Sequence, residues 1–189
     1  MPPKIKITKE EIVHASIEII RKSGQESLNT RNIAASLSCS TQPIFSNFAN
    51  MEQLHTAVRS YAHNLYLSFL DKEDKKGIYP KYKAFGMAYI RFAKEERELF
   101  KLLFMCDNGA KQIPSTVDRE ASIELIMQSN AVSRATAELM QLEMWVFVHG
   151  IATMIATAYL TLDEALISDM LTDIYQGSRT RHLSKENLQ

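Results

Sequence analysis

The feature that most constrains the fold is a helix whose start, apolar spacing and end can all be read from residues 8–24. Thr8 and Glu11 form a capping box, in which each side chain satisfies a backbone N–H that the first helical turn leaves unbonded. Gly24 supplies a stop. Between them, apolar residues recur at helical spacing: Ile12, Ala15, Ile19 and Ile20. The sequence therefore predicts a helix of about four turns that ends near residue 23.

Two short helices are predicted to follow. The stretch "SLNTRNIAASL" indicates a helix capped by Asn29, with Ile33 and Leu37 on one face. Ser40 is the expected cap of a third helix, which contains "TQPIFSNF". Pro43 is compatible with that helix because it falls in the first turn, where an amide hydrogen would have no intrahelical partner. We therefore interpret this segment as a helix and not as a connection.

Longer helices are predicted for the rest of the chain. Asn50 with Gln53 starts a fourth helix, over about 51–72, and the polar stretch "KEDKKGIYP" interrupts the chain after it. Thr161 and Glu164 form a second capping box. We expect "DNGAKQIPST" to be an exposed loop and the tail "GSRTRHLSKENLQ" to be frayed. The remaining helices are expected at about 81–94, 95–106, 118–130, 133–160 and 162–177.

The predicted third helix has one apolar side and one polar side. With Ile44 pointing inward, Phe48 lies near it at about 100° per residue, and both can pack against Ile33, Leu37 and Ile19. The result is a three-helix nucleus around a helix-turn-helix. The outward side carries uncharged donors and acceptors of the kind that bond base edges in a DNA major groove. These residues are Thr41, Gln42, Ser46 and Asn47.

Residues 12–58, "IVHASIEIIRKSGQESLNTRNIAASLSCSTQPIFSNFANMEQLHTAV", resemble the N-terminal DNA-binding region of TetR-family transcriptional regulators. The similarity rests on the order of the first helix with Gly24, "LNTRNIA", a serine before the recognition helix, "IFxxF", and the asparagine and leucine that open the fourth helix. It implies an all-α protein with a helix-turn-helix domain at 1–50, a fourth helix that connects, and a ligand-binding and dimerisation domain at 51–189, with about nine helices in total.

The same resemblance implies which residues contact DNA. Arg31 is the expected charged anchor on phosphate, and Asn50 presents the amino end of the fourth helix to a phosphate. Three positions depart from the family, which usually has Gly at Ser38, Tyr at Phe45 and Lys at Met51. Two usual backbone contacts are therefore missing. The full set of expected DNA contacts is Thr30, Arg31, Ser40, Thr41, Gln42, Pro43, Phe45, Ser46, Asn47 and Asn50.

The resemblance also implies an effector cavity and a dimer. Trp145 and His149 lie four residues apart, on one helical face, in a stretch "WVFVHG" that resembles a motif of one branch of the family. His149 either orients a ligand or is a core histidine bonded to a protein group. The last two helices are expected to pair with their copies in a homodimer. The expected ligand-binding residues are Phe92, Phe104, Met105, Met127, Met144, Trp145, Val148 and His149.

Composition excludes several other classes. The 189 residues carry a formal net charge of 0 and two cysteines without a CxxC motif, and the N-terminus lacks the apolar core of a signal peptide, so we expect a cytoplasmic protein. The apolar segment 144–160 is short for a membrane span and lacks flanking Lys or Arg anchors, so we expect a buried helix there. Catalytic and phosphate-binding motifs are absent, which makes an all-α enzyme the weaker alternative and predicts no cofactor and no metal ion.

These observations predict a ligand-responsive regulator, most simply a repressor. It would bind palindromic double-stranded operator DNA as a homodimer and be released by a small hydrophobic effector. The alternative is a helical small-molecule-binding protein with weak or no specific DNA binding. That alternative is favoured by the near-neutral charge and by the lack of Tyr and Lys at positions 45 and 51.

Overall fold

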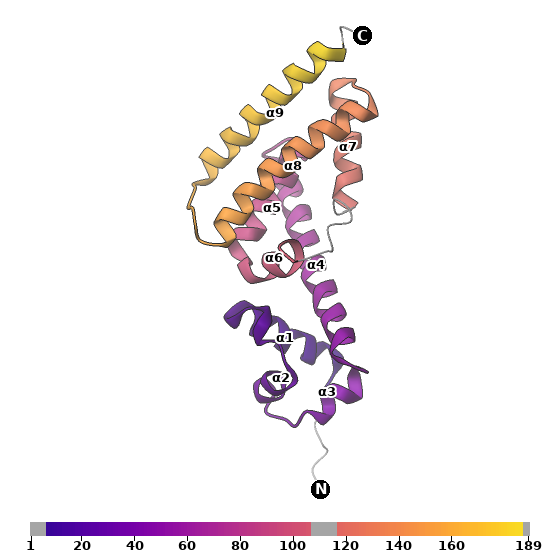
Figure 1. Ribbon diagram of the computed structural model, residues 1–189, viewed down its shortest axis with the longest axis vertical. Coiled ribbons are helices and arrows are strands. Elements are labelled where there is room, and N and C mark those ends of the chain that lie inside the picture. The colour runs from indigo at the N-terminus through magenta and orange to yellow at the C-terminus, as the bar shows by residue number, and fades with distance from the viewer. Residues whose placement is uncertain (1–6, 107–116, 187–189) are drawn as a thin grey trace. The chain divides into compact units, whose positions relative to one another are not determined.

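The computed structural model describes residues 7–106 and 117–186, in which the regular secondary structure is helical and contains no strand. The predicted all-α class is thus confirmed. The predicted loop at 107–116 lies outside the described residues. The α-helices, labelled in Figure 1, are α1 (Lys9–Ser23), α2 (Thr30–Ser36), α3 (Gln42–Asn47), α4 (Met51–Lys76), α5 (Lys81–Glu95), α6 (Arg97–Phe104), α7 (Val117–Asn130), α8 (Arg134–Ala156) and α9 (Glu164–Glu186). A 3-10 turn, η1 (Gln25–Ser27), lies between α1 and α2.

The chain divides into two compact units. The N-terminal unit comprises Met1–Leu67 and Glu96–Cys106, and the C-terminal unit comprises Ser68–Glu95 and Asp107–Gln189. Helix α6 therefore belongs to the same unit as α1 to α3, where it packs against α1, although it follows α5 in sequence. This division differs from the predicted boundary between residues 50 and 51. Because a compact unit is not the same thing as a functional domain, the domain assignment stays a prediction.

The start and end of α1 are as predicted. The Glu11 N–H donates to Thr8 Oγ1 (3.1 Å), the Thr8 N–H donates to Glu11 Oε2 (2.7 Å), and Gly24 ends the helix with φ 77°. The buried face differs from the predicted one: Ser16 and Ile17 are 0% and 1% exposed, whereas Ile19 is only half-buried. The inward stripe is therefore Ile12, Ala15, Ser16, Ile17 and Ile20.

Helix α3 is present, but its cap is not Ser40. The cap position is Thr41, whose side chain makes no capping hydrogen bond, and the first turn contains Pro43 as predicted. Ser40 fails as a cap because Pro43, three residues later, has no N–H to donate to a serine hydroxyl. Phe48 follows the helix in extended backbone (φ −131°, ψ 128°) and is nevertheless 1% exposed, like Ile44.

The turn between α2 and α3 holds Ser38 in a left-handed conformation. Its φ is 51°, and the turn is closed by the Cys39 N–H donating to the Ala34 carbonyl (2.9 Å) and the Ser38 N–H donating to the Ala35 carbonyl (3.1 Å). This pair of bonds is a Schellman motif, in which glycine is the preferred residue at the left-handed position. Ser38 therefore occupies a position that glycine would fill without steric cost.

Ser38→Gly is expected to raise the free energy of unfolding by about 1 kcal/mol, because glycine removes the steric cost of a left-handed residue. Urea unfolding followed by circular dichroism measures it. The control is Ala35→Gly, at an exposed position within α2, which should lower the free energy of unfolding by about 0.5–1 kcal/mol. Two changes of the same sign would contradict the assignment of strain to Ser38.

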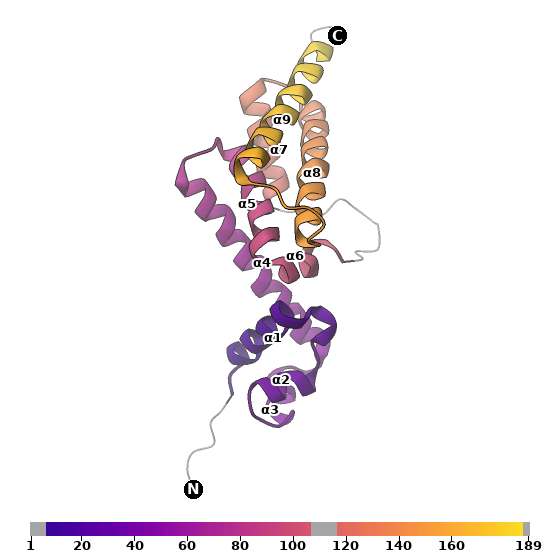
Figure 2. The same cartoon turned by 90° about the vertical axis from the view of Figure 1, so that its left-hand side faces the viewer.

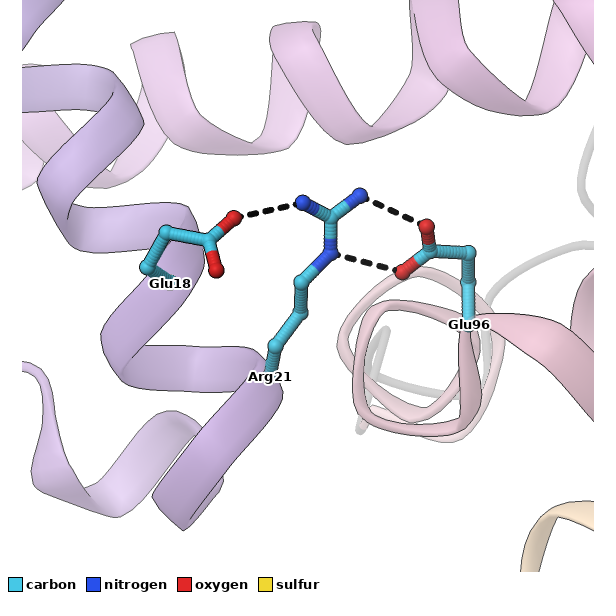
Figure 3. A network of polar contacts seen from close by, with 3 residues as sticks. All are labelled: Glu18, Arg21 and Glu96. Carbon is cyan, nitrogen blue, oxygen red and sulfur yellow. Dashed lines mark hydrogen bonds and ion pairs between the residues drawn. The ribbon is translucent and has the colours of Figure 1, made fainter.

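An arginine fork joins α1 to the start of α6 within the N-terminal unit (Figure 3). Arg21 donates from Nε and Nη2 to the two carboxylate oxygens of Glu96 (2.8 and 2.6 Å) and from Nη1 to Glu18 (2.6 Å). The hydrogen bonds to Glu96 raise the pKa of Arg21 above its usual value. Because bidentate pairs fix orientation as well as distance, the fork sets the position of Glu96, and with it the first turn of α6, against α1.

The C-terminal unit is a bundle in which α8 packs against α5, α7 and α9 (Figures 1 and 2). The predicted end of α8 near residue 160 is wrong, because the helix stops at Ala156. Ala158 adopts φ 56°, and the Tyr159 N–H donates to the Met154 carbonyl (2.9 Å). The helix thus closes with a second Schellman motif, in which alanine takes the place usually held by glycine.

Helix α9 also departs from the prediction at both ends. The helix begins at Glu164, and the Leu166 N–H donates to the Asp163 carboxylate (2.7 Å), so Asp163 replaces the predicted Thr161 capping box. The tail predicted to fray after residue 177 is helical to Glu186. Buried contacts hold it there: Ser178 donates to Glu143 of α8 (2.6 Å), and His182 lies 3.2 Å from the same carboxylate.

Within the described residues, α8 is the one helix long and apolar enough to cross a membrane by length and composition. It carries a buried stripe that faces its neighbours in the bundle, and 39% of its most apolar window is buried. The buried residues of the stripe are Ala137, Met140, Met144, Val148, Ile151, Ala152, Ile155 and Ala156. The prediction of a buried helix is therefore confirmed for this stripe only, since Leu139, Leu142 and Val146 of the same helix are 52%, 36% and 56% exposed.

Candidate functional site

The exposed side of α3 is the first candidate site. Ile44 and Phe48, both 1% exposed, anchor the segment in the N-terminal unit. Ser40, Thr41, Gln42 and Ser46 are exposed, and so is Phe45, at 54%. The predicted orientation of the helix is thereby confirmed for these residues. Pro43 is half-buried at the edge of the exposed side.

Three polar residues predicted at this site have internal hydrogen bonds. The Ser46 hydroxyl donates to the Gln42 carbonyl (3.0 Å), and Asn50 Oδ1 accepts the Gln53 N–H (2.9 Å) at the start of α4. Asn47 departs from the prediction of an outward residue. It is half-buried, and its Nδ2 donates to the carbonyls of Pro43 (2.8 Å) and Ile7 (3.2 Å). The reason is geometric, since position 47 lies about 60° from the inward-facing Ile44 on the helix.

The start of α2 supplies the charged part of the site. Asn29 caps the helix by accepting the Asn32 N–H (3.0 Å), which places Thr30 and Arg31 in the first turn. Arg31 is exposed and Thr30 is half-buried. No negative side chain pairs with Arg31 among the described residues. A guanidinium in this state can bind phosphate without first breaking an ion pair.

Lys9 is a cation near α3 to which the sequence assigned no partner. Its Nζ lies 5.0 Å from the centroid of the Phe48 ring, which is within the range of a cation–π contact. Together with the bond from Asn47 to the Ile7 carbonyl, this contact holds the beginning of α1 against the end of α3. The sequence offered one signal for the contact made by Asn47: it lies three residues after Ile44, and therefore close to the buried side of α3.

The second candidate site lies in the C-terminal unit around His149. The rings of Trp145 and His149 stack at 5.1 Å between centroids with an interplanar angle of 10°, so the predicted shared face is confirmed. The hydroxyl of Tyr89, on α5, lies 2.9 Å from His149 Nδ1. Burial lowers the pKa of His149 and raises that of Tyr89. Both rings are therefore neutral near pH 7, and His149 has a protein partner, which favours the core-histidine interpretation.

The other predicted ligand residues belong to both compact units. Phe92, Met144 and Val148 are buried in the C-terminal unit at 0%, 5% and 8% exposure. Met127 packs against a buried cluster of α7 and α8. Phe104 and Met105 belong to the N-terminal unit, where the Phe104 ring contacts Tyr66 edge-on at 5.2 Å. The structure thus brings Tyr89, Trp145 and His149 together; Tyr89, 60 residues away from His149 in sequence, was missed.

We expect the free energy of unfolding to decrease as the pH is lowered, and part of this decrease to depend on His149. Because its pKa is lowered in the folded state, the unfolded chain takes up a proton first as the pH falls below about 6.5. Unfolding is then favoured increasingly until the folded-state pKa is passed. Urea unfolding between pH 7.5 and 5 should show a shallower loss for His149→Gln than for the wild type. Equal slopes would contradict the assignment.

Among the described residues, no group of three His, Cys, Asp or Glu side chains is placed to hold a metal ion. The candidate sites are therefore a polar face on a short helix and a cluster of aromatic rings. Neither arrangement provides a nucleophile with an adjacent base. Both suit binding better than chemistry.

Comparison with known proteins agrees with this description. Residues 82–174, about half of the chain, match the family model of the tetracycline repressor-like C-terminal domain. No curated protein matches the sequence.

Solved structures share the fold over nearly the whole chain. A TetR-like transcriptional regulator from Rhodococcus sp. RHA1 is 15% identical over 97% of this chain and 98% of its own, with a TM-score of 0.64. The fatty acid degradation regulator FadR from Bacillus halodurans is 14% identical over 95% and 97%, with a TM-score of 0.62. The multidrug binding protein EbrR, solved with imidazole, is 16% identical over 88% and 93%, with a TM-score of 0.59.

Proposed function

The chain is a TetR-family protein, and on that premise we propose that it is a transcriptional repressor that binds operator DNA and responds to a small molecule. The observation that carries the proposal is the exposed, uncharged side of α3, held in place by Ile44 and Phe48. Solvated helices commonly display Lys and Glu, whereas this side displays hydroxyl and amide groups, which suit base edges. We assign the protein no catalytic reaction and place it in the cytoplasm.

The proposed DNA interface combines contacts to the phosphate backbone with contacts to base edges. Arg31 at the start of α2 would bind phosphate, and the exposed residues of α3 would lie in the major groove. The remaining members of the interface are Thr30, Ser40, Thr41, Gln42, Pro43, Phe45, Ser46, Asn47 and Asn50, of which Asn47 would act by holding the segment at Ile7 and not by reading bases. A palindromic operator follows from a two-fold symmetric dimer.

The proposed dimer forms through α8 and α9. Leu139, Leu142 and Val146 are 52%, 36% and 56% exposed, and their spacing places them on the side of α8 opposite the buried stripe. Leu166 and Ile174 of α9 are 45% and 39% exposed. An apolar stripe along two long helices is the kind of surface that a second copy covers.

The proposed effector is small and hydrophobic and binds in the C-terminal unit. Trp145, which is half-buried and stacks on His149, supports this, since aromatic rings near a few polar atoms are typical of ligand sites. EbrR has been solved with imidazole and with malachite green, so one protein of this fold binds aromatic molecules. To move the dimer from mostly DNA-competent to mostly incompetent, the effector must favour the second state by about 5.5 kcal/mol.

The decisive experiment is a gel shift at low salt with the DNA that flanks the protein's own gene, against scrambled DNA of the same length and composition. We expect sequence-selective binding that weakens with salt. The alternative, a small-molecule binder of the same fold, is favoured by the formal net charge of 0. It would be supported by ligand binding in the purified protein without any selective shift.

Two substitutions distinguish the contact to phosphate from the contact to a base. Arg31→Ala should weaken binding to every DNA sequence and reduce the slope of log affinity against log salt by about 1, because one phosphate contact is lost. Gln42→Ala should relax base preference at one position in each half-site, at a cost of about 1–3 kcal/mol on the preferred site. Fluorescence anisotropy over a salt series with single-base operator variants measures both. An unchanged preference in Gln42→Ala would contradict the orientation of α3.

A further inference from the structure

The hydrogen bonds within α3 limit which of its residues can read a base. The Ser46 hydroxyl donates its hydrogen to the Gln42 carbonyl (3.0 Å), and both hydrogens of the Asn47 amide group are directed to the Pro43 and Ile7 carbonyls (2.8 and 3.2 Å). By contrast, the side-chain amide of Gln42 has no partner among the residues that the structure describes. Gln42 is therefore the long polar side chain of α3 that remains available to a base.

Phe45 lies beside Gln42 on this exposed side. The two residues are three apart in a helix, so their side chains are neighbours, about 60° apart around the axis. Phe45 is 54% exposed, whereas the two other large apolar residues of the segment, Ile44 and Phe48, are 1% exposed. The apolar ring of Phe45 therefore contributes little to the core. It lies on the same exposed side of α3 as Gln42, the side that we propose faces DNA.

The chemistry of the ring restricts its partner. Phenylalanine has no hydrogen-bond donor, so it cannot bind a phosphate oxygen as a tyrosine hydroxyl can. The major-groove edge of a base pair offers one apolar group, the 5-methyl group of thymine, and phenylalanine is among the side chains suited to it. Helix α3 also has no charged residue that could bind a phosphate beside the ring.

We propose that Phe45 is a specificity-determining residue that reads the 5-methyl group of a thymine next to the base pair read by Gln42. This inference rests on the proposed function, because it requires α3 to enter the major groove. Gln42 would bond N6 and N7 of an adenine, and Phe45 would cover the methyl group of the adjacent thymine. Each half-site would then contain one position where the methyl group itself, and not the hydrogen-bonding pattern, is recognised.

Deoxyuridine provides a direct test, because it differs from thymidine in that position by the methyl group alone. In a bound operator, each thymine is replaced in turn by deoxyuridine, symmetrically in both half-sites, and affinity is measured by fluorescence anisotropy. At one position the wild type should lose about fourfold in affinity per half-site, or about 15-fold for the dimer, which is the effect of one buried methyl group. A bromine at C5 of the uracil, similar in size to a methyl group, should restore binding.

Variants of the protein identify the residue responsible. Phe45→Ala should bind the thymine and deoxyuridine operators with equal affinity, whereas Phe45→Tyr, which keeps the ring, should retain the difference. Gln42→Ala is the matched control, because it should lose the adenine preference and keep the preference for thymine over deoxyuridine. Circular dichroism of each variant confirms folding. If the alanine variant does not fold, Phe45→Gln, which removes the apolar ring from this exposed position, replaces it and should likewise bind the two operators with equal affinity.

Three outcomes would overturn the proposal. In the first, no thymine position is sensitive to removal of the methyl group in the wild type. In the second, Phe45→Ala keeps the same ratio between the two operators. In the third, Phe45→Ala changes the oligomeric state and not the ratio, so that the ring contacts a second copy of the protein. Each presupposes a wild type that binds DNA selectively; complete absence of such binding would instead refute the proposed function.

Discussion

Phe48→Ala is expected to lower the free energy of unfolding of the N-terminal unit by about 3–5 kcal/mol, the usual cost of removing a buried phenylalanine ring from a core. Phe48 is 1% exposed, and its N–H donates to the Ile44 carbonyl (2.9 Å). The ring also lies under Lys9, 5.0 Å from Nζ, so the substitution removes the contact between α3 and the start of α1 as well. Hydrogen exchange of the α1 to α3 amides, with urea unfolding, measures the loss.

Phe45→Ala is the matched control for this experiment. It removes the same side chain three residues earlier, from a position that is 54% exposed. The change in free energy of unfolding should stay within about 0.5–1 kcal/mol, as for most exposed positions. Comparable losses in the two variants would contradict the orientation of α3 on which the whole DNA interface depends.

Val146→Glu is expected to convert the proposed dimer into a monomer. The side chain is 56% exposed, the most exposed of the three residues in the apolar stripe on α8. In a two-fold symmetric interface each substitution occurs twice, and like charges placed together cost several kcal/mol. The dimer dissociation constant should rise at least about 100-fold, which corresponds to about 3 kcal/mol. Sedimentation equilibrium over a concentration series measures it.

Ile78→Glu is the control for surface charge in general. Ile78 is 67% exposed in the connection between α4 and α5, outside the two helices proposed to form the interface. Its replacement should leave the association state of the wild type unchanged. A wild type that is monomeric at micromolar concentration, or a Val146→Glu variant that dimerises like the wild type, would exclude α8 as the interface.

The sequence was sufficient to predict features whose signals lie within one turn of a helix. The capping box at Thr8, the caps at Asn29 and Asn50 and the stop at Gly24 are all confirmed because a cap is a local bond between near neighbours. The same applies to the stacking of Trp145 on His149, since residues four apart share a face. The exposed side of α3 followed from the inward position of Ile44.

Features that depend on distant residues could not be predicted. Tyr89 reaches His149 only because α5 packs against α8, and the end of the chain stays helical because α9 finds buried partners such as Glu143. The early end of α8 at Ala158 was missed for a different reason. The Schellman motif there uses alanine in a left-handed conformation, so the sequence lacks the glycine that usually marks it.

The bond between Asn47 and the Ile7 carbonyl has a practical consequence for handling the protein. Because it holds residue 7 against α3, anything attached to the N-terminus leaves the folded chain beside the helix that we propose enters DNA. An affinity tag at that end would crowd the operator and reduce apparent binding for reasons unrelated to the recognition residues. Removal of an N-terminal tag by a protease keeps the binding measurements interpretable.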